Sequence, residues 1–301
     1  MNGIRSERDR VRIALRAMGA AMSGATAASS FKLLAPLARP ITAHVRRDLA
    51  YGPDVRQRLD LFTPSGKVRS GRRPILLFVH GGGFVGGDKN MGVFFDTIAN
   101  WCVEHGLIGA TMTYRLAPAA RWPSGAEDLA GAVHWLKQHG AAHGGNGRRI
   151  YLMGHSAGAT HCASLFRHFP DLAETLAGVI LASGIYDLAA PGFRPIVAAY
   201  ADEDDAGGTG LDLIADLASS TVRMGIVLAE LEPAAFHRDA LRLLRALLDR
   251  DGILPPFARL AGHNHYSSIL SVGSDLGREF EAFLREFIGP DDLDAGGDEV
   301  G

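Results

Sequence analysis

The sequence predicts an α/β fold in which helices cover both faces of a mostly parallel, eight-stranded sheet. Helix-like and strand-like stretches alternate from about residue 44 onward, which is typical of a doubly wound sheet. The central strand candidates are continuous apolar runs, as expected for strands that are covered on both faces. Two glycine-rich sequences, at residues 80–84 and 154–158, each follow such a run directly and are the first candidates for a functional site.

Each element is indicated by its hydrophobic periodicity, and the helix candidates carry apolar residues at spacings of three and four. Strands are expected at residues 44–50, 57–62, 75–80, 107–114, 149–154, 176–182, 224–230 and 257–260. Helices are expected at residues 92–104, 126–138, 157–168, 234–248 and 271–287. The first two strands are expected to form an antiparallel edge. Residues 191–220 break the alternation, and we interpret them as an excursion near the mouth of the site that helps to shape its pocket.

The composition excludes several classes of protein. A hydrophobic fraction of 47% and a charged fraction of 21% are ordinary for a globular domain, and a net charge of −2 gives no reason to expect nucleic acid or an anionic membrane as a partner. No run of about 18 apolar residues predicts a transmembrane helix, so we expect a cytoplasmic protein without stable membrane insertion. Cys102 and Cys162 are interpreted as buried thiols, and no spacing of Cys or His indicates a metal or another cofactor.

The chain is expected to divide into three parts. Residues 1–43 contain early arginines and a stretch rich in Ala, Met and Gly that Arg16 interrupts, which favours an N-terminal helical arm or cap over the site rather than a cleaved signal. Residues 44–289 form the α/β domain. Residues 290–301 are acidic and Gly-rich, and we expect a flexible tail. The oligomeric state stays open, and a helix-mediated homodimer is compatible with the sequence.

The sequence Gly-His-Ser-Ala-Gly at residues 154–158 lies between a strand candidate and a helix candidate. A serine between two glycines at such a junction can be held in a sharp, strained turn, because glycine tolerates the close backbone approach on either side. The hydroxyl of Ser156 is then exposed at the tip of the turn. This arrangement is typical of a nucleophile elbow, so Ser156 is the candidate nucleophile of a serine hydrolase.

A second motif, His-Gly-Gly-Gly-Phe at residues 80–84, follows another apolar strand candidate. When a serine attacks a carbonyl group, the negative oxygen that forms is stabilised best by rigid backbone N–H groups. Gly82 and Gly83 have no Cβ atoms to block the approach of such an oxygen. Ala157 offers a further N–H group at the start of a helix, where the helix dipole favours an anion. These three residues are the candidate oxyanion hole.

A serine hydroxyl needs a base within hydrogen-bonding reach, and the base needs an acid to orient it. In this type of sheet the acid lies between the nucleophile and the base along the chain. Glu232 is the favoured acid, because it follows the strand candidate at residues 224–230 and precedes a proline that starts the next helix. Glu230, which is closer to the strand, and Asp187, which follows the preceding strand, remain alternatives.

The base is expected in the sequence Gly-His-Asn-His-Tyr-Ser at residues 262–267, between the last strand candidate and the C-terminal helix. Either histidine of this sequence could be the base. We favour His265, and we interpret His263 as structural or as lining the pocket. His155 is fixed by its place beside the nucleophile and is expected to point beside the pocket rather than to take protons.

Together these motifs resemble those of the α/β-hydrolase carboxylesterases of the hormone-sensitive-lipase-like kind, and among them the small bacterial esterases near the arylformamidases. The matching sequences lie, in the family's order, at residues 80–84, 114–118, 122–123 with 127–128, 154–158, 183–188 and 262–265. The resemblance implies an α/β-hydrolase fold with Ser156 as nucleophile and His265 as base. It implies Gly82, Gly83 and Ala157 as the oxyanion hole.

The resemblance also concerns residues around the triad. It implies that His80 is structural and that Tyr114 and Arg115 pack and hydrogen-bond behind the site. The family's acid is usually Asp in a Glu-x-Asp-Pro sequence, whereas this chain has Glu-Leu-Glu-Pro at residues 230–233. Because glutamate is one methylene longer, the loop must retreat slightly to keep the same distance between carboxylate and imidazole.

The sequence therefore predicts a carboxylic ester hydrolase that acts on a small-molecule ester through a Ser-His-Glu triad and an acyl-serine intermediate. Hydrolysis of an amide or formamide, as in an arylformamidase, or opening of a lactone could use the same residues. A catalytically dead hydrolase that serves as a ligand-binding receptor is a third interpretation. It is disfavoured because Ser156 and His265 are both present.

Overall fold

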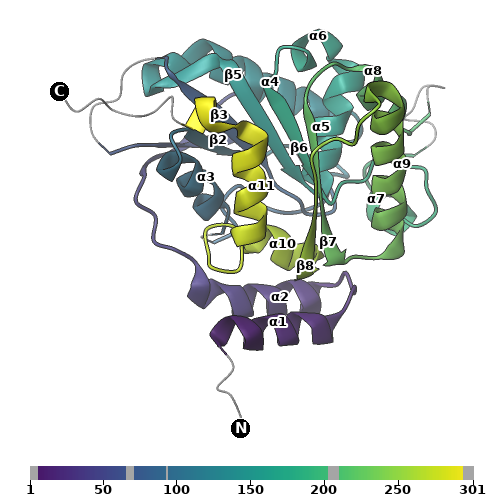
Figure 1. Cartoon of the computed structure of the whole chain (residues 1–301). Helices are drawn as coiled ribbons and strands as arrows, with labels where there is room; N and C mark the ends of the chain where they lie inside the picture. Colours follow the sequence, from purple (N-terminus) through teal and green to yellow (C-terminus); the bar gives the residue numbers. More distant parts are fainter. Residues whose placement is uncertain (1–5, 66–70, 93, 203–209, 294–301) are drawn as a thin grey trace.

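The computed structural model describes residues 6–65, 71–92, 94–202 and 210–293, and its centre is one eight-stranded sheet (Figure 1). The strands are β1 (His44–Ala50), β2 (Arg58–Thr63), β3 (Arg73–Val79), β4 (Ile108–Met112), β5 (Gly145–His155), β6 (Gly178–Ala182), β7 (Met224–Leu231) and β8 (Phe257–Asn264). They lie in the order β1-β2-β4-β3-β5-β6-β7-β8. All eight strands agree in place with the sequence prediction.

The helices that flank the sheet also follow the prediction for the most part. They are α3 (Phe94–Glu104), α4 (Ser124–His139), α5 (Ala157–His168), α6 (Pro170–Ala173), α7 (Arg194–Val197), α8 (Ile214–Ser219), α9 (Ala234–Asp251), α10 (His265–Leu270) and α11 (Arg278–Ile288). The short helices α7 and α8 belong to the segment that interrupts the alternation, between β6 and β7. The same segment contains an acidic, glycine-rich run at residues 201–208, most of which lies outside the described residues.

The sheet is mixed at one edge and parallel elsewhere. β1 pairs with β2, and β2 with β4, in antiparallel register, whereas every neighbouring pair from β4 to β8 is parallel. The predicted antiparallel edge is therefore confirmed. The inner strands β3, β4 and β6 are buried along their whole length, because helices cover both faces of the sheet.

Alternate residues of the central strands point into two separate cores. Ile75, Leu77 and Val79 of β3 belong to the core beneath α4, α5 and α9, while Leu76 and Phe78 belong to the core beneath α3 and α11. Figure 1 shows α3 and α11 on the near face of the sheet and α4 and α5 behind it. Parallel strands covered on both faces hold the loops at their carboxyl ends at one rigid edge.

The predicted helix at residues 271–287 is wrong in its first part. Residues 271–277 form turns between α10 and α11, and Gly273 has a positive φ of 80°. A Cβ at Gly273 would lie 2.6 Å from the Cβ of Thr97, so the chain passes α3 too closely for a side chain. The hydroxyls of Ser271 and Ser274 bond to backbone carbonyls three residues earlier, and such local bonds compete with a continuous helix.

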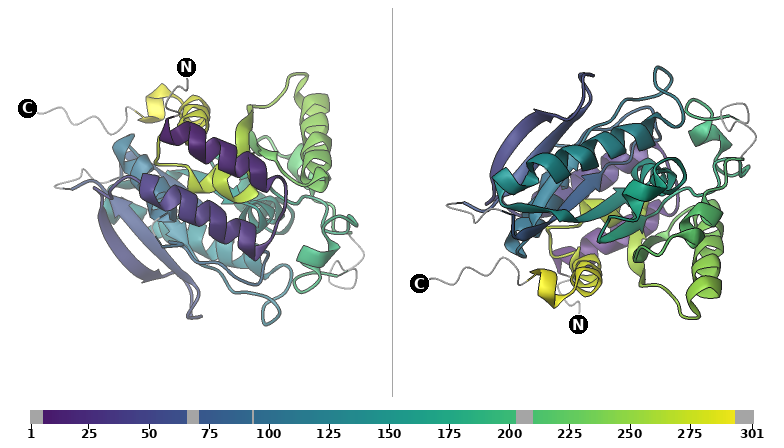
Figure 2. Two further views of the ribbon diagram at one scale, coloured as in Figure 1. Left: turned by 90° about the horizontal axis from the view of Figure 1, so that it is seen from below. Right: turned by 90° about the horizontal axis from the view of Figure 1, so that it is seen from above.

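The N-terminal arm consists of two helices, α1 (Glu7–Met18) and α2 (Gly24–Leu34), where the sequence indicated one. Figures 1 and 2 show them side by side below the carboxyl end of the sheet, in front of α10 in the view from below. α1 contacts β8 and α2 contacts α10. Leu15 and Leu34 are buried in the core that α3 and α11 cover, so the arm packs tightly on the rest of the molecule.

The expectation of a flexible tail from residue 290 is wrong for its first four residues. Pro290–Leu293 form a short helix, α12, in which the side chain of Asp292 is buried. Asp292 accepts a hydrogen bond from the Tyr151 hydroxyl at 2.5 Å and pairs with Nε of Arg149 at 2.6 Å. These partners, far away along the sequence, hold the acidic segment against β5. The remaining residues of the predicted tail, 294–301, lie outside the described residues.

Candidate active site

Ser156 occupies a strained turn between β5 and α5. Its φ of 55° and ψ of −123° lie where non-glycine residues are rare. A Cβ at Gly158 would come within 2.0 Å of the Val79 carbonyl oxygen, and one at Gly154 within 2.5 Å of the Gly158 carbonyl oxygen. Both positions flanking the serine therefore require glycine, as expected for a nucleophile elbow. The Ser156 N–H donates to the carbonyl of Ala182 at 2.9 Å, which ties the turn to β6.

Glu232 and His265 meet at the ends of β7 and β8. Nδ1 of His265 donates a hydrogen bond to Oε2 of Glu232 at 3.0 Å, and both side chains are buried. His265 begins α10, whose start is fixed by Asn264: its side-chain oxygen accepts from the N–H groups of Tyr266 and Ser267. The pairing satisfies Nδ1 and leaves Nε2 of the imidazole for another partner.

The alternative residues lie in other surroundings. Glu230 accepts a hydrogen bond from the Gly262 N–H at 2.6 Å and pairs with Arg259 at 3.2 Å, so it supports the loop after β8. Asp187 pairs with Arg242 at 2.9 Å. His263 is buried and its Nδ1 lies 3.2 Å from the hydroxyl of Ser267. His263 is absent from the residues that line the pocket around Ser156, so of its two predicted roles the structural one fits.

Ser156 and His265 line the same pocket, which has a volume of about 430 Å³. Its other lining residues are mostly apolar or glycine: Met22, Ser23, Gly24, Gly81, Gly82, Gly83, Val85, Phe95, His155, Pro195, Ile196, Ala199, Tyr266, Ile269 and Leu270. They come from the N-terminal arm, the loop after β3, α3, the end of β5, the segment around α7, and α10. Within the described part of the chain, no Asp, Glu, Lys or Arg side chain lines this pocket.

The loop after β3 brings Gly82 and Gly83 to the pocket in conformations that favour glycine. Gly82 has a φ of 143° and Gly83 a φ of 59°. A Cβ at Gly82 would lie 2.0 Å from the carbonyl oxygen of Gly86. The N–H of Gly86 in turn donates to the carbonyl of Gly82 at 3.1 Å. Ala157 is the first residue of α5, so its N–H has no acceptor within the helix. Gly82 and Gly83 therefore line the same pocket as Ser156, and Ala157 follows Ser156 directly in the chain.

His80 and Tyr114 pack behind this loop. The two rings are stacked with centroids 4.4 Å apart, and the Tyr114 hydroxyl donates to the His80 carbonyl at 2.8 Å. Burial lowers the pKa of His80 to about 4, so its ring is neutral and Nδ1 can donate to the Gly81 carbonyl at 2.6 Å. The Arg115 backbone N–H and side chain both bond to Asp128. These contacts place the three residues as the resemblance implied.

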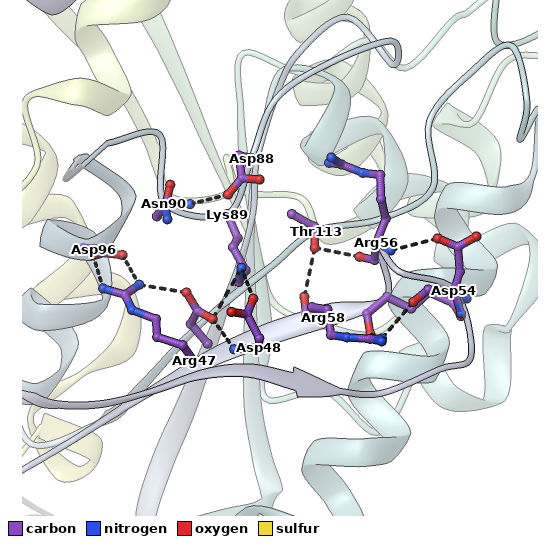
Figure 3. Close-up of polar contacts among 12 residues, drawn as sticks. Arg47, Asp48, Asp54, Arg56, Arg58, Asp88, Lys89, Asn90, Asp96 and Thr113 are labelled. Atoms are coloured by element: carbon purple, nitrogen blue, oxygen red, sulfur yellow. Dashed lines mark hydrogen bonds and ion pairs between the residues drawn. The ribbon is translucent and has the colours of Figure 1, made fainter.

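A cluster of charged side chains holds the far end of the same loop (Figure 3). Lys89 donates to Asp48 at 2.7 Å and lies 3.5 Å from an oxygen of the buried Asp60. Arg47 of β1 bridges Asp60 at 2.7 Å and Asp96 of α3 at 2.5 Å. We call Arg47, Asp48, Asp60, Lys89 and Asp96 the ionic cluster. None of its members lines the pocket.

The sequence prediction missed the ionic cluster and two contacts beside the pair of Glu232 and His265. Nε2 of His155 donates to the His265 carbonyl at 3.0 Å, and the hydroxyl of Ser183 donates to Oε1 of Glu232. Opposite charges on two strands of a predicted antiparallel edge could have indicated the Arg47–Asp60 pair. No sequence pattern indicates the Ser183 contact, because its partner lies on a different strand-end loop.

In the part of the chain that the structure describes, no group of three or more His, Cys, Asp or Glu side chains is arranged to hold a metal ion. Cys102 and Cys162 are buried free thiols, as predicted. The described helices include none that is both long and apolar enough to cross a membrane. Among the polar side chains that line the pocket are those of Ser156 and His265, and Glu232 is hydrogen-bonded to His265 behind it.

Comparison with known proteins gives partial matches in sequence and full-length matches in structure. The BD-FAE family model matches residues 59–172. Isoprenylcysteine alpha-carbonyl methylesterase of Arabidopsis thaliana is 36% identical over 115 residues, which are 38% of this chain and 26% of that protein. Esterase LipI of Mycobacterium tuberculosis is 36% identical over 103 residues, 33% of this chain and 30% of that protein. The matches thus span about a quarter to a third of the length of these curated relatives.

An esterase of Pyrobaculum calidifontis has a similar structure, with a TM-score of 0.70 at 21% identity over 95% of this chain and 97% of that one. A thermostable esterase from Pseudomonas putida gives a TM-score of 0.64 at 17% identity over 93% and 98% of the two chains. At such identities the likeness establishes the fold. The chain therefore has the α/β-hydrolase fold, and its predicted resemblance to the carboxylesterases of the hormone-sensitive-lipase-like type is confirmed.

Proposed function

We propose that the protein is a carboxylic ester hydrolase that works through an acyl-serine intermediate. One observation carries the proposal: His265, which is hydrogen-bonded to Glu232, lines the same pocket as Ser156, together with Gly82 and Gly83, which have positive φ. Nucleophile, base, acid and oxyanion donors are the four components that serine hydrolases require. The relatives named above are esterases, which supports the same activity.

In the proposed mechanism, Nε2 of His265 takes the proton of the Ser156 hydroxyl while the serine oxygen attacks the ester carbonyl. Glu232 keeps Nδ1 protonated and stabilises the imidazolium that forms. The N–H groups of Gly82, Gly83 and Ala157 bind the negative oxygen of the tetrahedral intermediate. His265 then gives its proton to the leaving alcohol, and water repeats the cycle on the acyl-serine.

The pocket supports a neutral, small to medium ester as the substrate. About 430 Å³ is at the small end of the range for ligand pockets, and no charged side chain of the described residues lines it to balance a charge on the substrate. We further propose that α1 and α2 act as a cap over the bound ester. Met22, Ser23 and Gly24, which join these helices, line the pocket, and that position supports the proposal.

The test is a turnover assay on p-nitrophenyl acyl esters of increasing acyl length, with N-formylkynurenine as the competing formamide substrate. We expect ester turnover that Ser156→Ala lowers by about 10⁶-fold while the fold is kept. The control is Ser164→Ala, which removes a buried hydroxyl from α5 that, among the described residues, bonds only to the Thr160 carbonyl. Undiminished turnover by Ser156→Ala contradicts the proposal, and turnover of N-formylkynurenine without ester turnover replaces it with a formamidase.

A further inference from the structure

Ser183 lies between the nucleophile and the acid, at the carboxyl end of β6. Its neighbour Ala182 accepts the hydrogen bond from the Ser156 N–H at 2.9 Å. Ser183 itself donates its backbone N–H to the Val227 carbonyl of β7 at 2.8 Å and its hydroxyl to Oε1 of Glu232. Two consecutive residues at this strand end therefore connect the turn that holds the nucleophile with the side chain of the acid.

The two oxygens of Glu232 have different partners. Oε2 accepts from Nδ1 of His265 at 3.0 Å, and Oε1 accepts from the hydroxyl of Ser183. The last torsion of a glutamate side chain has a broad energy minimum, so one hydrogen bond leaves the carboxylate free to rotate. A second bond on the opposite oxygen restricts that rotation. All three side chains are buried, so water competes little for either oxygen.

The backbone of Ser183 is held in a conformation that directs its hydroxyl to this place. Its φ is 50°, in the left-handed region that serine rarely occupies, and only 2% of the residue is exposed. Strained backbone is maintained where the surrounding structure fixes it, and such positions cluster at functional sites. Ser183 is absent from the residues that line the pocket, so it acts on the site through another residue.

We infer that Ser183 is a positioning residue for catalysis: its hydroxyl holds the carboxylate of Glu232 in the orientation that keeps His265 aligned with Ser156. The inference rests on the proposed function. It also accounts for how the carboxylate of a glutamate, which is longer than aspartate by one methylene, is kept at hydrogen-bonding distance from the imidazole. The hydroxyl restrains the longer side chain from the side of β6, opposite to the bond with His265.

The test is Ser183→Gly, because glycine adopts a positive φ without strain and removes the hydroxyl together with its one methylene group. We expect kcat for a p-nitrophenyl ester to fall by about 10- to 100-fold, since small misplacements of catalytic groups have effects of that size. KM should stay within about twofold, because Ser183 does not line the pocket. The melting temperature should fall no further than in Ser164→Ala, which removes a hydroxyl that is equally buried and remote from the triad.

A second pair of variants tests whether the effect passes through the acid. In the background of Glu232→Gln, Ser183→Gly should change kcat by less than about threefold, because residues that act as a unit are not additive. An unchanged kcat in Ser183→Gly overturns the inference, and so does a full additional loss in the Glu232→Gln background. If the fall in apparent kcat of Ser183→Gly is no larger than the fall in its fraction of folded protein, Ser183 has a structural role and the inference is likewise overturned. If Ser156→Ala keeps its turnover, the proposed function itself fails, which is a separate outcome.

Discussion

The two sides of the pocket are held in place by different kinds of contact. On the oxyanion side, the loop after β3 depends on glycine backbone near the pocket and on the ionic cluster at its far end. On the acid side, the side chain of Glu232 depends on single hydrogen bonds with the buried side chains of Ser183 and His265, while the ion pair of Asp187 with Arg242 lies nearer the surface.

Because of this difference, we expect the two sides to contribute differently to the stability of the fold and to the rate of the reaction. The ionic cluster connects β1, β2, α3 and the loop, but it reaches no residue that we assign to catalysis. The hydrogen bonds on the acid side connect few elements, but each ends on a proposed catalytic group. Removing a polar contact should therefore lower the free energy of unfolding on one side and the rate of reaction on the other. The predictions below test that contrast, beginning with the largest effect.

The largest effect is expected on the acid side, from Glu232→Gln. An amide in place of the carboxylate cannot stabilise the imidazolium and favours the wrong tautomer of the histidine, so kcat should fall by about 10⁴-fold. The control variants are Glu230→Gln and Asp187→Asn, whose carboxylates pair with Arg259 and Arg242 instead of with His265. We expect less than about tenfold change in kcat for either. The reverse ranking in a p-nitrophenyl ester assay would move the acid to another residue.

On the oxyanion side, Gly82→Ala should have the next largest effect. Its Cβ would meet the Gly86 carbonyl oxygen at 2.0 Å, so the turn must open and the Gly82 N–H must turn away from the anion. Loss of one such donor lowers kcat by about 10²- to 10³-fold. Gly86→Ala is the matched control, because its added Cβ would lie 3.8 Å from the nearest atom and its φ is not positive. Equal loss of kcat in both variants would contradict this account of the loop.

The ionic cluster should affect stability more than rate. Lys89→Met removes a nearly buried ammonium group and leaves the buried carboxylate of Asp60 with Arg47 as its one remaining cationic partner among the described residues, beside the Asp48 N–H, so we expect the free energy of unfolding to fall by about 3 kcal/mol. Arg245→Met, which breaks an exposed pair with Asp249, should lower it by less than about 0.5 kcal/mol. Urea unfolding measures both. A kcat per folded molecule that drops more than about threefold in Lys89→Met would remove the contrast between the two sides.

The parts of this molecule that the sequence predicted are those determined by local patterns. The buried apolar runs give the strands, and the glycines at positions 154, 158 and 82 are required by contacts with the chain a few residues away or with the adjoining strand. What was missed depends on partners that are distant in sequence. Ser183 and Glu232 are 49 residues apart, and Tyr151 and Asp292 are 141 apart. A side chain's hydrogen-bonding partner is decided by the packing of the sheet, which the periodicity of a single segment does not contain.

The last prediction concerns Asp239 on α9, whose carboxylate accepts the backbone N–H groups of Tyr186 at 2.5 Å and Asp187 at 3.2 Å. These residues belong to the loop that follows Ser183, so Asp239 holds the backbone of that loop from α9. Burial raises the pKa of Asp239 to about 6 from 3.8, and it outweighs the two backbone hydrogen bonds and the nearby Arg242, which lower it. The folded protein therefore binds the proton of this carboxyl group more tightly than the unfolded chain does.

A carboxyl group with a raised pKa contributes stability that is fully present below about pH 4 and is lost as the pH rises through about 6. Relative to Asp239→Asn, which keeps an acceptor oxygen but does not titrate, the protein should thus lose up to roughly 3 kcal/mol between pH 4 and pH 7. Urea unfolding of both proteins across this range measures the difference, with Asp249→Asn as an exposed control on the same helix. A difference that stays constant with pH would mean that the two backbone N–H groups keep the carboxylate charged in the folded state. A buried ion would then support the acid side, and its contrast with the oxyanion side would be smaller.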